Sequence, residues 1–469
     1  ITTIIINELE RGSFRLVHFY ERRARRILPA LFFVMLACVP FAWFLLLPGE
    51  MRDFSQSLLA VATFSSNILF WLESGYFDRA AELKPLLHTW SLAVEEQYYI
   101  FFPLFLIAAW RFGRQWILVL LSVVFIVSLG LAQWGAYASP DAAFFLLPTR
   151  GWELLVGVFV AFYLQKNSPP QIKLLNETGS ALGLVMILFA VFTFNDATPF
   201  PGFYALLPTL GTALIIFCAV KDTWVQRLLS LRGMVAIGLI SYSAYLWHQP
   251  LLVFARLVTA ENPSLFLVIS MCLLAFVLAT LSYQFVEKPF RNKNFLSTRR
   301  IFISSAVMMS AFLLVGASLM RADADLQRYA TKGFAGDIGH GTFHDYVEDN
   351  NFSCRPENIY AEAETWAGFV RCQQSLESPP SIVLFGDSHA EHLFIGISER
   401  LKSESVVYFI RAGLPFAGES NFDYLLDYIN AHAEIETVIY ASYWSRAVAA
   451  LGEEVFQSKL VDTINAFSA

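Results

Sequence analysis

Long apolar runs dominate this chain, and they limit its fold more than any other feature. The runs lie at about 27–47, 97–111, 116–137, 143–164, 178–195, 203–221, 234–257, 264–286 and 301–319. Most approach the length of about 20 residues that an α-helix needs to cross a bilayer. Of the 469 residues, 56% are hydrophobic and 15% are charged, whereas soluble domains are about 25% charged. The sequence therefore predicts a multi-pass α-helical membrane bundle.

Lysine and arginine gather in alternate loops, which predicts the orientation of this bundle. Cytoplasmic loops of membrane proteins carry an excess of these residues. Placing the basic clusters in the cytoplasm gives a consistent alternation from residue 97 to residue 319. The apolar run 54–72, which several serines interrupt, then does not cross once, and we interpret it as re-entrant or interfacial. The stretch from His88 to Glu96 is expected at the outer face.

That stretch places an imidazole, a hydroxyl and two carboxylates directly before an apolar run. In a helix, His88, Ser91 and Glu95 would share one face. Ionisable groups at the edge of a bilayer are expensive, so they are functional candidates. The alternative is an interfacial cap, with Trp90 in an aromatic belt.

Arginines cluster just before the first apolar run, at Arg22, Arg23, Arg25 and Arg26. Guanidinium groups at the cytoplasmic edge suit an anionic ligand such as the phosphates of acyl-CoA. The alternative is topology anchoring with lipid headgroup binding.

Two further groups lie within apolar runs. Arg150, close to Trp152 and Glu153, is a candidate for lining a pore. Tyr245 and His248 contribute to an aromatic and imidazole face, for which packing is the alternative.

After residue 320 the chain becomes polar, which predicts a second domain. We expect a membrane domain at 1–319, a linker region or domain edge at 320–380 and an α/β domain at 381–469. Apolar strands near 381–385, 406–410 and 437–441 alternate with helical segments, which favours a parallel sheet. The alternation of basic loops places this domain outside the cytoplasm.

The turn Gly386-Asp387-Ser388-His389 follows the first of these strands and opens a helix. A serine there projects from the carboxyl end of the sheet, where active sites of open α/β sheets lie, beside helix amides that can hold an oxyanion. This favours a nucleophile, and the alternative is a helix N-cap.

Cys354 and Cys372 lie in the polar region and can form a disulfide in an oxidising compartment. The scattered histidines show no metal-ligand spacing, and nothing indicates nucleic-acid binding.

The same turn resembles block I of the SGNH hydrolases. The resemblance implies a catalytic site with Ser388 and Asp387, and an oxyanion-hole amide at Gly413. Where that family usually has asparagine after the third strand, Ala441-Ser-Tyr-Trp-Ser445 resembles the variant of membrane-fused members. The family's final Asp-x-x-His has no match before Ala469, so we expect a truncated, incomplete α/β domain.

The membrane half resembles the acyltransferase-3 family of bacterial integral membrane proteins. The matching segments are Phe19–Ala30, Leu86–Gln97, Tyr242–His248 and Glu287–Arg291. Members of this family O-acylate surface glycans, and several carry a C-terminal SGNH domain. A family helix with a catalytic histidine would precede residue 1, so we expect truncation there too.

The resemblance implies an inner-membrane O-acyltransferase with a periplasmic C-terminal domain. Acyl-CoA, expected to be acetyl-CoA, would bind Arg22, Arg23 and Arg26. His88 and Glu95 would polarise groups at the outer end, and Ser388 would pass the acyl group to a glycan such as O-antigen or exopolysaccharide. The alternatives are a membrane-anchored SGNH esterase and a transporter.

Overall fold

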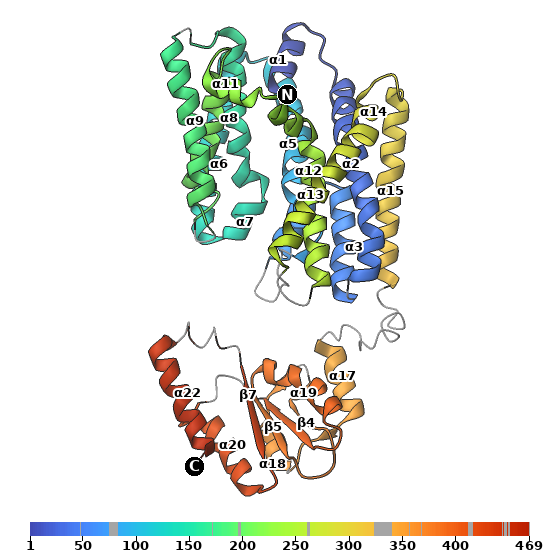
Figure 1. Cartoon of the computed structure of the whole chain (residues 1–469), viewed down its shortest axis with the longest axis vertical. Helices are drawn as coiled ribbons and strands as arrows, with labels where there is room; N and C mark the ends of the chain where they lie inside the picture. The colour runs from blue at the N-terminus through green and yellow to red at the C-terminus, as the bar shows by residue number, and fades with distance from the viewer. Residues whose placement is uncertain are drawn as a thin grey trace. The chain divides into compact units, whose positions relative to one another are not determined.

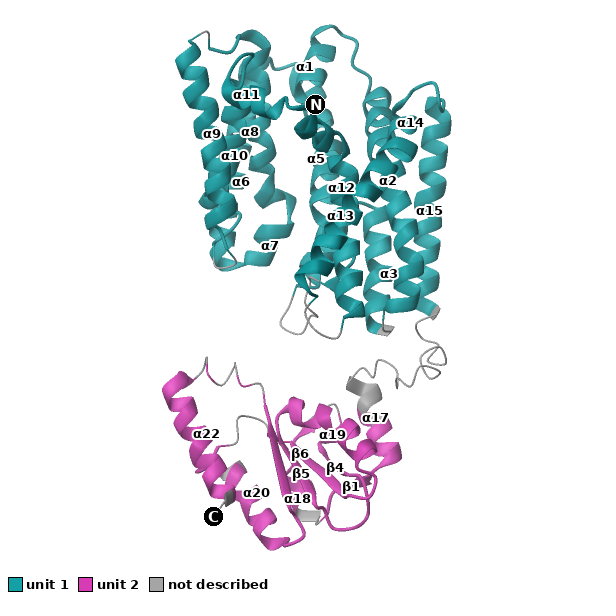
Figure 2. Ribbon diagram, in the orientation of Figure 1, with its two compact units in different colours: residues 1–334 teal, residues 335–469 magenta. Residues whose placement is uncertain are grey.

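The computed structural model divides into two compact units, Ile1–Phe334 and Ala335–Ala469, which are described separately (Figure 2). It describes residues 1–46, 48–74, 83–170, 172–195, 198–259, 263–322, 340–355, 357–366, 368–410, 416–442, 444, 448 and 451–468.

The N-terminal unit is a bundle of helices (Figure 1). Its helices are α1 (Thr2–Glu10), α2 (Leu16–Leu45), α3 (Pro48–Ala62), α4 (Ser66–Leu72), α5 (Thr89–Trp110), α6 (Arg114–Ala138), α7 (Pro140–Phe145), α8 (Leu147–Lys166), α9 (Lys173–Thr193), α10 (Leu206–Cys218), α11 (Trp224–Leu229), α12 (Arg232–Val258), α13 (Leu265–Ser282), α14 (Lys288–Arg291) and α15 (Thr298–Ala322). A 3-10 turn, Phe203–Ala205, precedes α10, and a π-helical turn, Tyr283–Glu287, follows α13.

Seven helical spans among the described residues are long and apolar enough to cross a membrane. They are formed by α2, α5, α6, α7 with α8, α9, α13 with its following turns, and α15. Large apolar side chains on these helices are exposed, for example Phe192 at 82% and Phe266 at 81%. In a bilayer such surfaces contact lipid, while backbone polar groups stay bonded within each helix. The predicted multi-pass helical bundle is confirmed.

Helix α2 begins earlier than the apolar pattern predicts. The pattern starts at residue 27, whereas the helix starts at Leu16 and continues through Pro29 and Pro40. The arginine cluster therefore lies inside the helix, on its second and third turns, instead of in the loop before it. Tertiary partners for the arginines, described below, make this extension possible.

The apolar run 54–72 is divided between two short helices, α3 and α4. They are separated at Phe64, which has a left-handed φ of 53°. Helix α3 packs closely on α15, since a Cβ added at Gly316 would lie 2.9 Å from the Leu59 side chain. Neither helix has the length of a single crossing, and its re-entrant or interfacial placement stays a prediction.

The C-terminal unit is built around a five-stranded mixed sheet in the order β1-β4-β6-β5-β7. Its strands and helices are α17 (His340–Asn350), β1 (Phe352–Ser353), α18 (Glu357–Glu362), β2 (Thr365–Trp366), β3 (Phe369–Val370), β4 (Cys372–Gln374), β5 (Ile382–Gly386), α19 (Ser388–Arg400), β6 (Val406–Ile410), α20 (Ser420–Ala431), β7 (Thr437–Ala441) and α22 (Glu453–Ser468). The three expected strands, β5, β6 and β7, are parallel, whereas β4 joins β6 antiparallel.

Helices cover both faces of the central strands (Figure 1). Alternate residues of a strand point to opposite faces. Val383 and Phe385 pack with α20 and α22, while Leu384 packs with α17 and α19. This burial on both faces explains the continuous apolar runs of β5 and β6.

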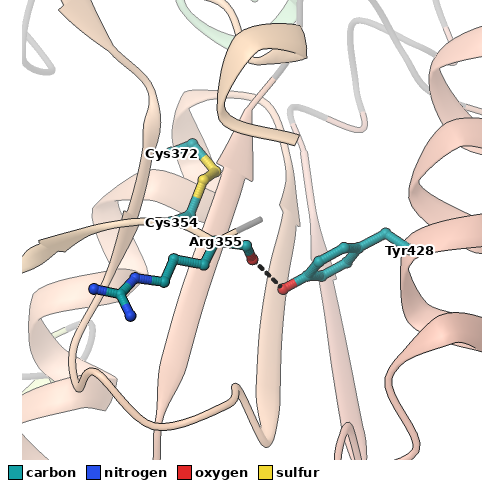
Figure 3. The surroundings of a disulfide bond; sticks show 4 residues. All are labelled: Cys354, Arg355, Cys372 and Tyr428. Atoms are coloured by element: carbon teal, nitrogen blue, oxygen red, sulfur yellow. Dashed lines mark hydrogen bonds between the residues drawn. A yellow bond between two sulfur atoms is a disulfide. The ribbon is translucent and has the colours of Figure 1, made fainter. Parts of the chain in front are cut away.

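Residues before β5 also belong to this unit, within the region 320–380 for which the sequence left a linker and a domain edge open. Strands β4 and β1 extend the sheet beyond β6 to its edge, and a disulfide joins Cys354 to Cys372 with their Cα atoms 5.5 Å apart (Figure 3). Beside it, the Tyr428 hydroxyl donates a hydrogen bond of 3.0 Å to the Arg355 carbonyl. Short strands without strong alternation gave no sequence signal for this edge.

Candidate functional site

A polar cluster lies at the start of α5, inside the bundle. His88, the N-cap residue, is 8% exposed. Its ring centroid lies 5.0 Å from that of Tyr245 and 5.4 Å from that of His248, both on α12. Within the described part of the chain, neither ring nitrogen of His88 has a hydrogen-bond partner. The helix N-cap position thus holds a buried imidazole with two open nitrogens.

Hydrogen bonds tie this cluster together. The Ser91 and Tyr245 hydroxyls are 3.0 Å apart, and the Tyr245 hydroxyl also donates to the His88 carbonyl. His248 Nδ1 lies 2.6 Å from the Tyr245 carbonyl. Because a carbonyl only accepts, Nδ1 carries the proton and Nε2 keeps its lone pair. Four residues predicted separately, His88, Ser91, Tyr245 and His248, therefore form one group.

Glu95 is not part of this hydrogen-bonded group. It lies seven residues beyond His88, roughly 10 Å along the helix. Its side chain is exposed, and among the described residues it makes no hydrogen bond or ion pair. The neighbouring Glu96, which the sequence analysis did not select, is 8% exposed instead.

The arginines of α2 differ sharply in their surroundings. Arg23 Nη2 lies 2.7 Å from Glu96 Oε1, and its guanidinium carbon lies 3.9 Å from the centre of the Tyr99 ring. Arg22 pairs with Glu8 at 3.0 Å. Two of the three arginines expected to bind a donor, Arg22 and Arg23, are therefore already paired with carboxylates.

Arg25 and Arg26 point in different directions. Arg25 is buried, pairs with Glu21 at 2.8 Å and donates to the carbonyl of Leu296 at 2.6 Å, so it holds the segment after α14. Arg26 is exposed, and within the described residues no ion pair or hydrogen bond engages it. Arg26 is consequently the guanidinium best able to bind an anionic ligand.

The predicted pore residue Arg150 contacts another predicted residue, Trp90. Its guanidinium carbon lies 5.3 Å from the Trp90 ring, 5.6 Å from Phe144 and 5.1 Å from Phe200. Arg150 Nη1 is 3.2 Å from Glu153 Oε1. Residues from α5, α7, α8 and the segment before α10 thus form an aromatic cage around an ion pair.

In the C-terminal unit, Ser388 is the first residue of α19, directly after β5. The turn depends on Gly386, whose φ is +142° and whose added Cβ would lie 1.9 Å from the Ala441 carbonyl oxygen. No other residue type fits this close approach. The Ser388 side chain is half-buried, and among the described residues it makes no hydrogen bond.

Asp387 is an N-cap. Its Oδ1 accepts from the His389 backbone N–H at 2.9 Å and lies 2.8 Å from His389 Nδ1. Its Oδ2 accepts from the Ser442 hydroxyl at 2.8 Å. The capping alternative is therefore realised by Asp387, which leaves the Ser388 hydroxyl open.

The remaining SGNH-like positions are only partly described. Gly413 lies outside the described residues, so the predicted oxyanion amide has no geometry here. After β7, Ser442 occupies the first position and Trp444 packs on Tyr440, with ring centres 4.7 Å apart. Burial, with the charges of Glu419 and Asp387, raises the pKa of Tyr440.

Sequence reasoning missed a buried ion network beside Ser388. Arg371 Nη2 lies 2.5 Å from Glu391 Oε2, and Arg371 Nη1 lies 3.0 Å from Glu364. His344 Nδ1 is 3.7 Å from Glu391 Oε1. Burial lowers the pKa of Arg371, but the hydrogen bonds and charge of Glu391 outweigh it and raise the pKa overall. Charged residues scattered along a sequence give no sign that they will meet.

No group of three or more histidine, cysteine, aspartate or glutamate side chains with metal-site geometry occurs in the described ranges.

Comparison with known proteins agrees with these two units. The model of an acyltransferase domain matches residues 9–284, and that of an SGNH domain fused to AT3 domains matches residues 354–469. A putative O-acetyltransferase of Staphylococcus aureus strain COL is 32% identical over 310 residues, covering 62% of this chain and 50% of that protein. The O-acetyltransferase OatA of S. aureus strain NCTC 8325 is 33% identical over 313 residues, covering 63% and 51%.

The chain spans about half the length of the curated relatives it matches. No solved structure matches it. Because the acyltransferase model covers more than half of the sequence, the chain belongs to the acyltransferase domain family, in the form that carries an SGNH domain.

Proposed function

We propose that this protein is a membrane-bound O-acetyltransferase that moves an acetyl group from cytoplasmic acetyl-CoA to a hydroxyl of a surface glycan. Family membership and the O-acetyltransferase names of its relatives support this activity. The observation that carries the proposal is the pairing of two sites in one chain. A helix bundle with a buried imidazole cluster is joined to a unit with an open serine at a strand-to-helix turn.

The donor site is the Arg26 face of α2. Acyl-CoA carries phosphates, and a guanidinium binds phosphate through charge-assisted hydrogen bonds. Arg22 and Arg23 are neutralised by Glu8 and Glu96, whereas Arg26 is exposed. Their placement inside a membrane helix also supports a functional role, because charges there are expensive.

The imidazole cluster is the proposed intramembrane station. His248 Nε2 has a lone pair and acts as a base toward a thiol or hydroxyl that enters the cluster. His88, whose ring nitrogens make no hydrogen bond among the described residues, is a second candidate proton acceptor. Neutral imidazole is the usual general base near neutral pH.

In the final step, the Ser388 hydroxyl oxygen attacks the acyl carbonyl carbon. A base takes the hydroxyl proton and passes it to the previous carrier as the bond between that carrier and the acyl group breaks. A glycan hydroxyl then attacks the Ser388 ester, the same base takes the glycan proton, and this proton passes to the Ser388 oxygen as the ester bond to serine breaks. Splitting the transfer in this way lowers each barrier. The backbone N–H of Ser388, the first residue of α19, favours the developing oxyanion.

The C-terminal unit is proposed to lie outside the cytoplasm, on a bacterial inner membrane. Its disulfide supports this placement, because disulfides persist in oxidising compartments. The proposed acceptor is a polysaccharide such as lipopolysaccharide O-antigen or exopolysaccharide.

The test is base-labile O-acetyl ester on surface polysaccharide of cells that express the full-length protein. We expect ester from the wild type and its loss in His88→Ala, Ser388→Ala and Arg26→Gln. Arg300→Gln is the matched control, because Arg300 is an exposed arginine on α15 remote from these sites in sequence. Membrane levels of each variant are compared by immunoblot.

Full ester in Ser388→Ala would contradict the serine relay. Ester that falls when the wild type is expressed would identify an esterase. No ester in any strain, with the acceptor polysaccharide present, would contradict the transferase proposal.

A further inference from the structure

The ion pair of Arg150 and Glu153 borders an apolar groove. The groove lies between α8 and α10, has a volume of about 320 Å³, and is lined by Val156, Gly157, Ala205, Pro208, Ala213 and Ile216. Glu153, Phe200, Thr209 and Thr212 also line it. The two threonine hydroxyls donate to backbone carbonyls, and Glu153 and Phe200 both contact Arg150. Glu153 and Phe200 therefore link the groove to the aromatic cage around Arg150.

The apolar part of this site opens toward lipid. Ile216 at its rim is 57% exposed, and Leu210 on the same helix is 41% exposed. Small residues at Gly157, Ala205 and Ala213 leave room for a chain of methylene groups. Helix α10 is fixed in place, because Gly183 of α9 and Gly211 meet so closely that a Cβ at either would lie within 2.7 Å of the other's carbonyl oxygen. The groove is thus a rigid feature of the bundle.

The polar end has both donors and acceptors but no net charge. Arg150 Nη1 and Glu153 Oε1 are buried and make no hydrogen bond with good geometry among the described residues. A phosphate there would face the Glu153 carboxylate, which repels it. A sugar fits better, because its hydroxyls both donate and accept and its C–H face packs on an aromatic ring such as that of Phe200.

Trp90 also connects this site to the imidazole cluster. It lies on α5 two residues from His88 and one from Ser91, and its ring centre is 4.6 Å from that of Phe144. A head group bound at Arg150 is therefore separated from the His88 cluster by the first turn of α5.

We propose that this site binds a membrane glycolipid, with its hydrocarbon chain in the α8–α10 groove and a neutral sugar at Glu153 and Phe200, next to Arg150. The glycolipid site deepens the proposed function. It rests on that function only where the bound glycolipid is taken to be the acetyl acceptor. The acceptor then reaches the protein laterally from the bilayer, as a sugar already attached to lipid.

The test is photo-crosslinking of the full chain in lipid nanodiscs. The probe is an alkyl β-glucoside with a diazirine in its chain, compared with the corresponding alkyl alcohol and alkyl phosphate. Labelled residues are mapped by mass spectrometry on α8 and α10, and labelling of α13 gives the lipid background. Arg150→Met is compared with Arg300→Met.

We expect the glucoside to label α8 and α10 more than either other probe. Arg150→Met should reduce this labelling roughly tenfold, the loss of a charged hydrogen bond, and Arg300→Met should leave it unchanged. Equal labelling by the glucoside and the alcohol would overturn the sugar site, and preference for the phosphate would identify a phospholipid site instead.

An acetyl-transfer assay on the glucoside separates the two proposals. Selective labelling without acetyl transfer to any hydroxyl would retain the glycolipid site and contradict the transferase. Transfer to free glucose as efficient as transfer to the glucoside, together with unselective labelling, would contradict only the glycolipid site.

Discussion

The Arg371–Glu391 ion pair links the residue before β4 to α19, the helix that begins at Ser388. Removing this pair tests how far buried ion pairing stabilises the C-terminal unit. The side chains are 11% and 1% exposed, and three hydrogen bonds link them. Removing one partner of a buried ion pair destabilises a protein by about 3–5 kcal/mol, whereas breaking an exposed pair changes stability by about 1 kcal/mol or less. Glu391→Gln leaves Arg371 with Glu364, so we expect about 3 kcal/mol, the lower end of the buried range.

The free energy of unfolding of the C-terminal unit can be measured by urea titration of the full chain in detergent, with pulse proteolysis as the readout. Glu364→Gln is the matched control, because Glu364 is 28% exposed and Arg371 keeps its three bonds to Glu391. We expect that variant to lose at most about 1 kcal/mol. The double variant Arg371→Met/Glu391→Leu should recover part of the loss, since it leaves no buried unpaired charge.

A loss of unfolding free energy below about 1 kcal/mol in Glu391→Gln would refute this reasoning, because that is the size expected for an exposed ion pair that water screens. Equal losses in Glu391→Gln and Glu364→Gln would also contradict it. A labelling assay of Ser388 with a fluorophosphonate then shows whether the pair also positions the serine.

Three further predictions concern the same unit. Gly386→Ala should destabilise the C-terminal unit by roughly 3 kcal/mol or more through backbone strain. Gly396→Ala, at a position on α19 with open space around it, should instead stabilise the unit by about 0.5–1 kcal/mol. Unfolding titrations of both variants test this contrast. Cys354→Ser should lower the free energy of unfolding by about 3 kcal/mol, the value for a disulfide that closes a loop near the 18-residue separation found here. A wild-type protein that is equally stable with and without reductant would contradict this prediction. Burial raises the pKa of Tyr428 to about 12, so the folded state holds this proton more tightly than the unfolded state. The resulting contribution to folding stability is complete below pH 10 and is lost as the pH rises toward 12. Tyr428→Phe should therefore flatten the dependence of stability on pH in this interval. An unchanged slope in this variant would count against the prediction.

Much of the architecture follows directly from the sequence. Apolar length alone predicts the helical bundle, because every apolar run of about 20 residues has only lipid or a large core in which to lie. The strand at 381–385 and the turn at Gly386 to Ser388 are local features, so they too can be identified without tertiary information. The extended start of α2 could not be, because Arg22 and Arg23 are paired there with Glu8 and Glu96, which lie on other helices.

The choice of residues within each site came from tertiary structure. His88, Ser91, Tyr245 and His248 were individually visible as polar residues in apolar surroundings, but α5 and α12 are more than 140 residues apart in sequence at this contact. Glu96 rather than its neighbour Glu95 is buried, since helix rotation decides which of two adjacent carboxylates faces α2.

The sequence by itself therefore determined the class of fold, the order of the two units and the chemical groups available. Only the tertiary structure decided which of those groups are neutralised, as Arg23 is by Glu96, and which stay open, as Arg26 and Ser388 do. The physical reason is that apolar periodicity and turn chemistry act over a few residues, whereas charge pairing acts across space between segments whose contact no local pattern encodes.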